Sequence, residues 1–292
     1  MPELSWVPMH GIGNRHDLPL PFAFVVAGAG LVLGISLVVL FFAWRVPRYP
    51  APGGIALPRL TRVVDHPGVR WTARPLVLAA FAWAGLALFF GQDRLTNPVF
   101  GFVYVWLWVG LVPLSLVLGP FWRAVNPLRT LHQGLSALAR IDPRQGLLTL
   151  STRAGVWPAA AGLFGFGWLE LVEPDRTSLA ALRVWVLAWL VIGLLGAIVF
   201  GRAWISAADP FEAYASTVAQ LAPWRRIDGQ VHLVRPLAGL NAWSPPPGAV
   251  GVVAVLLGPT AFDSFANTSG GSAPSRIPRP RRCSGPPVAW RR

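Results

Sequence analysis

The first side chains that could do chemistry are two imidazoles and a carboxylate near the start of the chain. His10 follows Met9, and His16 stands beside Asp17. Such groups could bind a divalent metal, and Met9 with His10 could suit copper. The simpler explanation is that they are solvated groups of a short polar tail over residues 1–18. A divalent-metal site at His10, His16 and Asp17 is one prediction, and a tail without a site is the alternative.

Three ionisable side chains fall at or inside apolar stretches: Glu170, Arg183 and Asp263. Charged groups within a membrane span usually face a partner or an aqueous path. We expect Glu170 and Arg183 near the outer surface, where an ion pair or a snorkelling side chain explains them equally well. The three are therefore candidate intramembrane functional charges.

No sequence motif identifies a reaction. The chain has no Walker phosphate loop, no G-x-S-x-G, no H-E-x-x-H and no C-x-x-C. Its only cysteine is Cys283, which excludes a disulfide framework and a cysteine-based metal site. Whether the protein is an enzyme stays open at this stage.

The composition is that of a membrane protein. Of 292 residues 54% are hydrophobic and only 13% are charged, about half the usual charged fraction of a soluble domain. The net charge of +13 is carried entirely by arginine, and these arginines cluster between apolar stretches. Membrane topology therefore explains the charge, and we expect the lipid bilayer as a partner and no nucleic acid.

The apolar stretches predict an all-α polytopic transmembrane helix bundle over residues 19–267. A membrane helix needs about 20 apolar residues. The predicted spans cover about residues 20–44, 75–91, 99–122, 156–172, 179–204 and 249–265. Pro75 is expected to open the second span, since proline suits the first helical turn. Whether the sixth stretch crosses is open, so five or six spans are predicted.

The arginine distribution predicts the orientation of these spans. Arginines crowd the loops after the first, third and fifth spans, whereas the turns that hold Arg94 and Arg176 are short. Because positive residues favour the cytoplasmic side, the N-terminus is predicted outside the cell membrane.

Spans two and three resemble spans four and five, which predicts a duplicated two-helix unit. Both copies would have the same orientation, as in a parallel repeat. The matched pairs are Asp93-Arg94 with Asp175-Arg176, Val105-Trp106 with Val184-Trp185, Arg123-Ala124 with Arg202-Ala203, and Asn126-Pro127 with Asp209-Pro210.

Asn126 and Asp209 each precede a proline and an amphipathic stretch, which predicts two helix N-caps. Glu212, three residues after Asp209, fits a capping box. We interpret both stretches as cytoplasmic helices lying along the membrane interface, with the gating elements of a transporter as the alternative.

Gly30 and Gly34 give a small-xxx-small spacing in the first span. This spacing lets a second helix approach closely, so it predicts a helix–helix partner or a homo-oligomer. Incidental glycine in an apolar run is the alternative.

Several stretches resemble a group of actinobacterial multi-pass membrane proteins commonly labelled fenitrothion hydrolase. The likeness lies in His10-Gly11-Ile12-Gly13, in Asp17 to Phe22, in Trp106 to Leu131 and in Ala261 to Phe265. The resemblance implies cleavage of a phosphotriester. The chain has no H-x-H pair and no lysine, so a hydrolase would need another design than the familiar binuclear one.

Residues 268–292 are rich in arginine, proline, serine and glycine, a composition that cannot build a core. We expect either a disordered tail or out-of-frame translation of a longer helical protein. Three functions follow as hypotheses: a membrane-bound hydrolase, a permease-like transport protein, and a non-catalytic assembly subunit.

Overall fold

The computed structural model describes residues 22–43, 53–173, 175, 177–235 and 237–266, in two units that divide after Ala51. In the first unit, α1 (Phe22–Val38) continues as one π-helical turn, η1 (Val39–Ala43). The polar tail predicted at 1–18 and the segment 268–292 lie outside the described residues.

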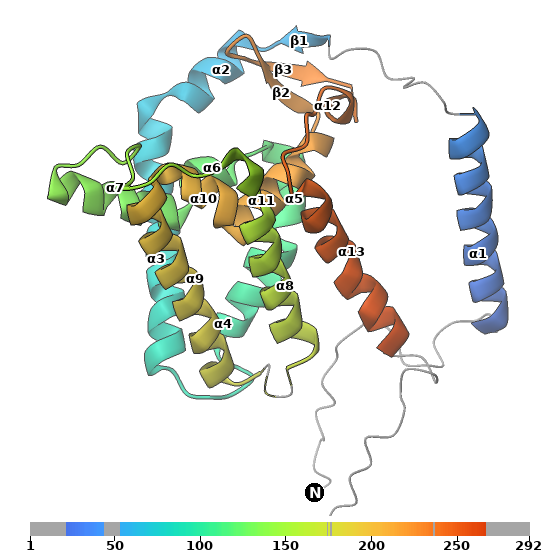
Figure 1. Ribbon diagram of the computed structural model, residues 1–292, viewed down its shortest axis with the longest axis horizontal. Helices are drawn as coiled ribbons and strands as arrows, with labels where there is room; N and C mark the ends of the chain where they lie inside the picture. The colour runs from blue at the N-terminus through green and yellow to red at the C-terminus, as the bar shows by residue number, and fades with distance from the viewer. Residues whose placement is uncertain (1–21, 44–52, 174, 176, 236, 267–292) are drawn as a thin grey trace, which may run out of the picture. The chain divides into compact units, whose positions relative to one another are not determined.

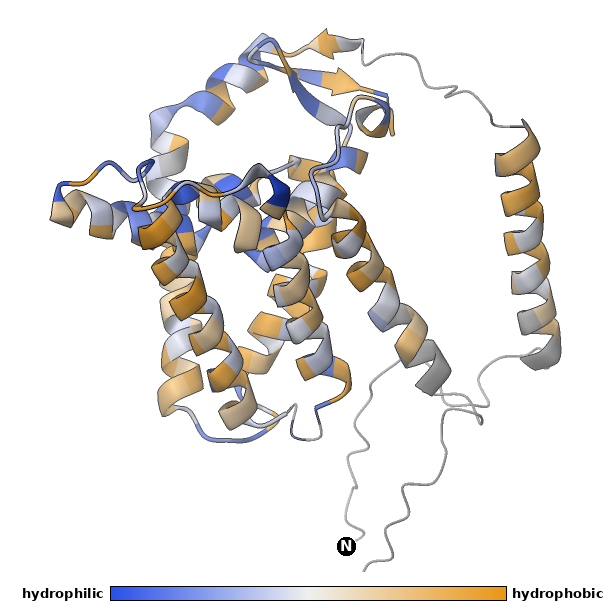
Figure 2. Ribbon diagram, in the orientation of Figure 1, coloured by the Kyte–Doolittle hydropathy of each residue, from blue (hydrophilic) through white to orange (hydrophobic). Residues whose placement is uncertain are grey.

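The second unit contains five long helical segments. They are α3 (Pro67–Phe90), the continuous α4–η2–α5 (Pro98–Phe100, Gly101–Val109, Leu111–Leu118), α8 (Trp157–Leu171), α9 (Leu179–Phe200) and α13 (Ala249–Ala266). Two of them, α3 and α9, run side by side in Figure 1 and are largely hydrophobic in Figure 2.

Three described helices are long and apolar enough to cross a membrane: Pro67–Phe90, Pro98–Leu118 and Leu179–Phe200. The predicted helical class and the membrane character are supported to that extent. The described apolar parts of α1 and α13 are shorter, Ala27–Val38 and Ala249–Pro259, and α8 has 15 residues. Five or six spans therefore stay a prediction.

The helices begin or end at other residues than three of the predicted spans. The second span begins at Pro67, where the His66 side chain accepts a hydrogen bond from the Gly68 amide, so Pro75 lies inside the helix. The third and fifth spans end earlier than predicted, at Gly119 and Gly201. Both glycines have positive φ, +69° and +68°, a conformation that stops a helix and favours glycine.

A layer of short helices gathers at one end of α3 and α9, away from the turn that joins α3 to α4 (Figure 1). It comprises α6 (Trp122–Val125), α7 (Pro127–Ala139), α10 (Arg202–Ala208), α11 (Pro210–Val218) and the 3-10 turn η4 (Ala219–Leu221). The 3-10 turn η3 (Thr152–Ala154) precedes α8.

The two helices that were expected at the membrane interface differ from each other. α7 fits the interface only in its second half, where Leu135 and Leu138 are exposed while Leu128 is buried. α11 does not fit it: its residues from Pro210 to Ala215 are buried, and it packs against α5, α6, α8 and α13. α11 is therefore a core element.

A small antiparallel sheet adds strands that the helical prediction missed, in the order β1 (Gly54–Ala56), β3 (Gln230–Val234), β2 (Trp224–Ile227). Asp228 and Gly229 join β2 to β3 with φ of +48° and +80°, as a two-residue hairpin requires. α2 (Pro58–Asp65) and α12 (Ala238–Asn241) accompany the sheet.

Candidate functional site

The chain makes the same local sequence of elements twice. A long helix stops at a glycine of positive φ, a short helix follows, and an Asn-Pro or Asp-Pro pair then begins another helix. The Asn126 carboxamide oxygen accepts from the amides of Leu128 and Arg129, at 2.9 and 3.3 Å. The Asp209 carboxylate accepts from the Phe211 amide at 3.3 Å. Both predicted N-caps are confirmed.

The two caps also bind each other. The Asn126 Nδ2 donates to Asp209 Oδ2 at 2.6 Å and to Glu212 Oε2 at 2.9 Å. Asn126 and Asp209 are 1% and 2% exposed. The starts of α7 and α11 are thus joined by a buried amide between two carboxylates.

An arginine from α7 neutralises the second carboxylate. The Arg129 Nε and Nη2 donate to the two oxygens of Glu212 at 2.7 and 2.6 Å, a bidentate pair with both residues buried. Nη2 also donates to Ser206 Oγ in α10 at 2.5 Å. The predicted capping box is wrong, because the Asp209 amide donates to Ile205 while Glu212 binds Arg129.

Two indole N–H groups also donate hydrogen bonds to the Asp209 carboxylate. Trp122 Nε1 donates to Oδ2 at 3.1 Å, and Trp189 Nε1, from the middle of α9, donates to Oδ1 at 3.0 Å. We call the six side chains Trp122, Asn126, Arg129, Trp189, Asp209 and Glu212 the buried network.

Burial makes the Asp209 carboxyl a weaker acid than usual. Desolvation, and then the nearby Glu212 carboxylate, raise the pKa of Asp209 to about 6, although its hydrogen bonds from Trp189, Trp122 and Asn126 oppose the rise. The group therefore exchanges a proton close to neutral pH, which is a property of functional carboxyls as well as of some structural ones.

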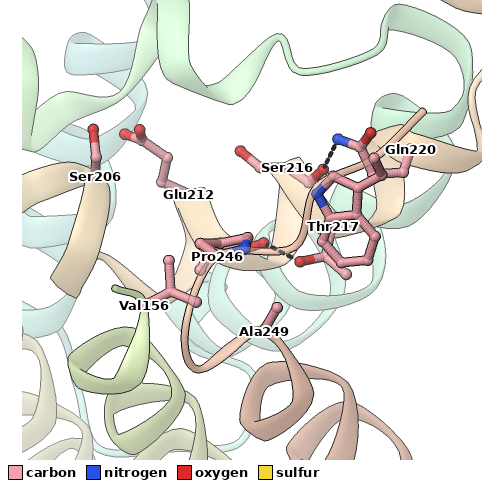
Figure 3. A pocket seen from close by; sticks show the side chains of 10 residues that line it. Val156, Ser206, Glu212, Ser216, Thr217, Gln220, Pro246 and Ala249 are labelled. Carbon is pink, nitrogen blue, oxygen red and sulfur yellow. Dashed lines mark hydrogen bonds between the residues drawn. The ribbon is translucent and has the colours of Figure 1, made fainter. Parts of the chain in front are cut away.

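The buried network borders two cavities of different character. A pocket of about 90 Å³ has a wall of mixed character, in which Glu212, Ser206, Ser216, Thr217 and Gln220 stand beside apolar residues such as Val156 and Pro246 (Figure 3). An apolar cavity of about 280 Å³ lies among α3, the 98–118 segment and α9. Trp189, which holds Asp209, forms part of its wall.

The sequence-predicted site residues do not meet in the described part of the chain. His10, His16 and Asp17 lie outside it, as does the side chain of Asp263, whose backbone belongs to α13. Among the described residues no three His, Cys, Asp or Glu side chains could hold one metal ion. The metal prediction therefore stays untested.

Glu170 and Arg183 have separate environments. Burial, and then the negative charge of Glu170 in α8, raise the pKa of Tyr214 in α11 to about 12. Arg183 in α9 donates from Nε to the Leu88 carbonyl at 2.9 Å and from Nη2 to the Phe89 carbonyl at 3.4 Å. It thus binds the C-terminal carbonyls of α3, where a cation is favourable.

Sequence reasoning missed Arg129 and Glu212 as partners, although a signal was present. Each stands three residues after its capping residue, in Asn126-Pro-Leu-Arg129 and Asp209-Pro-Phe-Glu212. Opposite charges at equivalent positions of two similar stretches indicate that the stretches face each other. The chain matches no protein-family model, no curated protein and no solved structure in the comparisons.

Proposed function

We propose that this chain is a permease-like protein of the cell membrane, with five or six spans, its N-terminus outside and a duplicated two-helix unit. In this proposal the two copies meet at the buried network, and Asp209 binds and releases the coupling proton. Transport proteins commonly contain internal repeats, discontinuous helices and acidic proton relays.

The contact between Asn126 and Asp209 carries the proposal. A purely structural junction needs no ionisable group, because burying a carboxylate is costly and an apolar contact of similar volume would often serve as well. Here a carboxyl that titrates at about pH 6 accepts hydrogen bonds from α6, α7 and α9. Because burial and the Glu212 carboxylate outweigh these donors, the charged form is the less stable one in the folded protein, so loss of the proton weakens the junction between the two copies.

The pocket beside Glu212 supports an aqueous path to this junction. Its wall holds Glu212, the Ser216 and Thr217 side chains and the Gln220 amide, which are polar partners for water. In the orientation that the arginines predict, this side of the bundle faces the cytoplasm.

Uptake into proteoliposomes tests the proposal for many solute classes at once. Vesicles with purified protein are incubated in a complex metabolite extract with the outside acidic, and their contents are compared by mass spectrometry with those of protein-free vesicles. We expect one solute class to accumulate with the wild type and to stop accumulating in Asp209→Asn. Asp65→Asn, which changes a partly exposed carboxylate in α2, should accumulate it normally.

The same preparations separate the alternatives. If correctly folded wild-type protein accumulates no solute under either direction of the proton gradient, the permease proposal fails. The hydrolase implied by the resemblance predicts turnover of a chromogenic phosphotriester instead. An assembly subunit predicts neither activity, but a co-purifying partner that Gly30→Leu and Gly34→Leu remove.

A further inference from the structure

The proposed function gives no role to the apolar cavity among the three long apolar helices. Residues of α3, of the 98–118 segment and of α9 line the cavity. Pro127, Leu131 and Phe211 of the short-helix layer complete the lining. Every lining side chain is apolar or an indole. A water molecule needs two to four polar partners, so water does not fill this space well.

The cavity has an open rim. Ala82 and Phe89, on the α3 wall, are exposed, and a Cβ on Gly85 would meet nothing within 4 Å. The surrounding helices are those long and apolar enough to cross a membrane, so in a membrane location this rim would face hydrocarbon. An unfilled apolar cavity costs stability, and a flexible chain can enter it from the bilayer.

A cation lies beside the cavity on the same face of α9. Arg183, Val186 and Leu190 are spaced three and four residues apart, so they share one helix face, and the latter two line the cavity. Arg183 also binds the carbonyls of Leu88 and Phe89, two further lining residues. In the described part of the chain these bonds engage two of its five N–H donors.

We propose that this cavity and Arg183 form a binding site for one anionic phospholipid of the surrounding bilayer. The phosphate binds the remaining N–H donors of Arg183, and one acyl chain runs along Val186 and Leu190 into the cavity. The helical rise from Arg183 to Leu190 is about 10 Å, so a headgroup at the membrane surface and a chain in the hydrocarbon both fit. The site requires a membrane location and does not require transport.

Retained lipid, measured by native mass spectrometry, tests the site. Full-length protein is reconstituted in vesicles of equimolar phosphatidylcholine and phosphatidylglycerol, extracted in mild detergent and analysed intact. We expect the wild type to retain one phosphatidylglycerol. Gly85→Leu fills the cavity and should abolish the bound lipid. Gly101→Leu adds the same side chain at an open site that does not line the cavity, and should retain it.

The charge is tested separately from the cavity. Arg183→Gln should keep a bound lipid but lose about fivefold in preference for phosphatidylglycerol over phosphatidylcholine. Arg94→Gln removes an exposed arginine from the turn after α3 and should leave the preference unchanged. Equal lipid retention by Gly85→Leu and the wild type, or a lipid-free dimer that covers the cavity, would overturn the proposal. These results are independent of solute uptake.

Discussion

Asn126 and Asp209 each cap the helix that they begin, and the amide of the first donates to the carboxylate of the second at 2.6 Å. One side chain thus satisfies backbone amides of its own helix and fastens that helix to the equivalent one. This double role explains why both positions are almost completely buried.

Two replacements of Asn126 should distinguish the free energy of its helix cap from that of its hydrogen bonds to Asp209 and Glu212. Asn126→Ser keeps a capping oxygen but is too short to bridge the carboxylates, and should cost about 1.5–3 kcal/mol of unfolding free energy. Asn126→Ala loses the cap as well and should cost about 1 kcal/mol more. Chemical unfolding in detergent measures both.

Asn97 provides the matched control for this prediction. It is also a buried Asn-Pro cap, but its amide donates to the neutral carbonyls of Ala87 and Gln92. Asn97→Ser should therefore cost less than Asn126→Ser. Equal costs would show that the carboxylate contact contributes nothing specific.

Glu212→Gln should be among the most destabilising conservative changes in the chain. It leaves the Arg129 guanidinium buried without its anion, an effect of about 3–5 kcal/mol. Asp65→Asn breaks the pair with Arg226, whose side chains are 37% and 46% exposed, and should cost about 1 kcal/mol or less. A similar loss of unfolding free energy in the two variants would contradict the assignment.

Gly201 and Gly119 should tolerate alanine unequally. Both have positive φ, which costs an L-residue about 1–2 kcal/mol. At Gly201 the new Cβ would also lie 2.6 Å from the Arg144 carbonyl oxygen, whereas at Gly119 the nearest atom is 4.0 Å away. Thermal unfolding should rank Gly201→Ala below Gly119→Ala, with Gly258→Ala in α13 near the wild type.

The sequence predicted local features well and long-range partners poorly. Both N-caps depend on residues next to each other, so Asn126-Pro127 and Asp209-Pro210 were sufficient to predict them. The helix breaks after Leu118 and Phe200 were not predicted, because hydropathy continues past Gly119 and Gly201 and only backbone conformation marks the break. The Asp228-Gly229 hairpin had a recognisable sequence signal that the prevailing helical pattern obscured.

The pairing of Arg129 with Glu212 could not be derived from hydropathy, because it depends on how two similar stretches face each other. α11 shows the same limit. Its amphipathic pattern favours a surface position, yet helices on several sides cover it, and the polar face is satisfied by Arg129 and Asn126 instead of water.

Stability should depend on pH through Asp209. The pKa of Asp209 is raised from 3.8 in the unfolded chain to about 6, so the native state binds more protons between these values. Stability therefore falls as pH rises through this window, by about 3 kcal/mol in total. Thermal unfolding of the wild type and Asp209→Asn across the window measures the difference.

His132 changes stability with pH in the opposite direction to Asp209, so the wild type must be compared with Asp209→Asn. Burial lowers the pKa of His132, so its contribution to stability is lost as pH falls below its usual value of 6.5. Subtraction of the Asp209→Asn profile removes this contribution, since both proteins retain His132. Parallel profiles in the two proteins would refute the Asp209 prediction.

The most direct test of the account is an infrared titration of the Asp209 carboxyl in reconstituted protein. Difference spectra of the wild type and Asp209→Asn isolate the carbonyl stretch of the protonated acid. The account predicts a band that appears as pH falls, with a midpoint of about 6, and that is absent from the variant. A carboxyl that stays ionised below its ordinary pKa would contradict a proton-binding junction between α7 and α11.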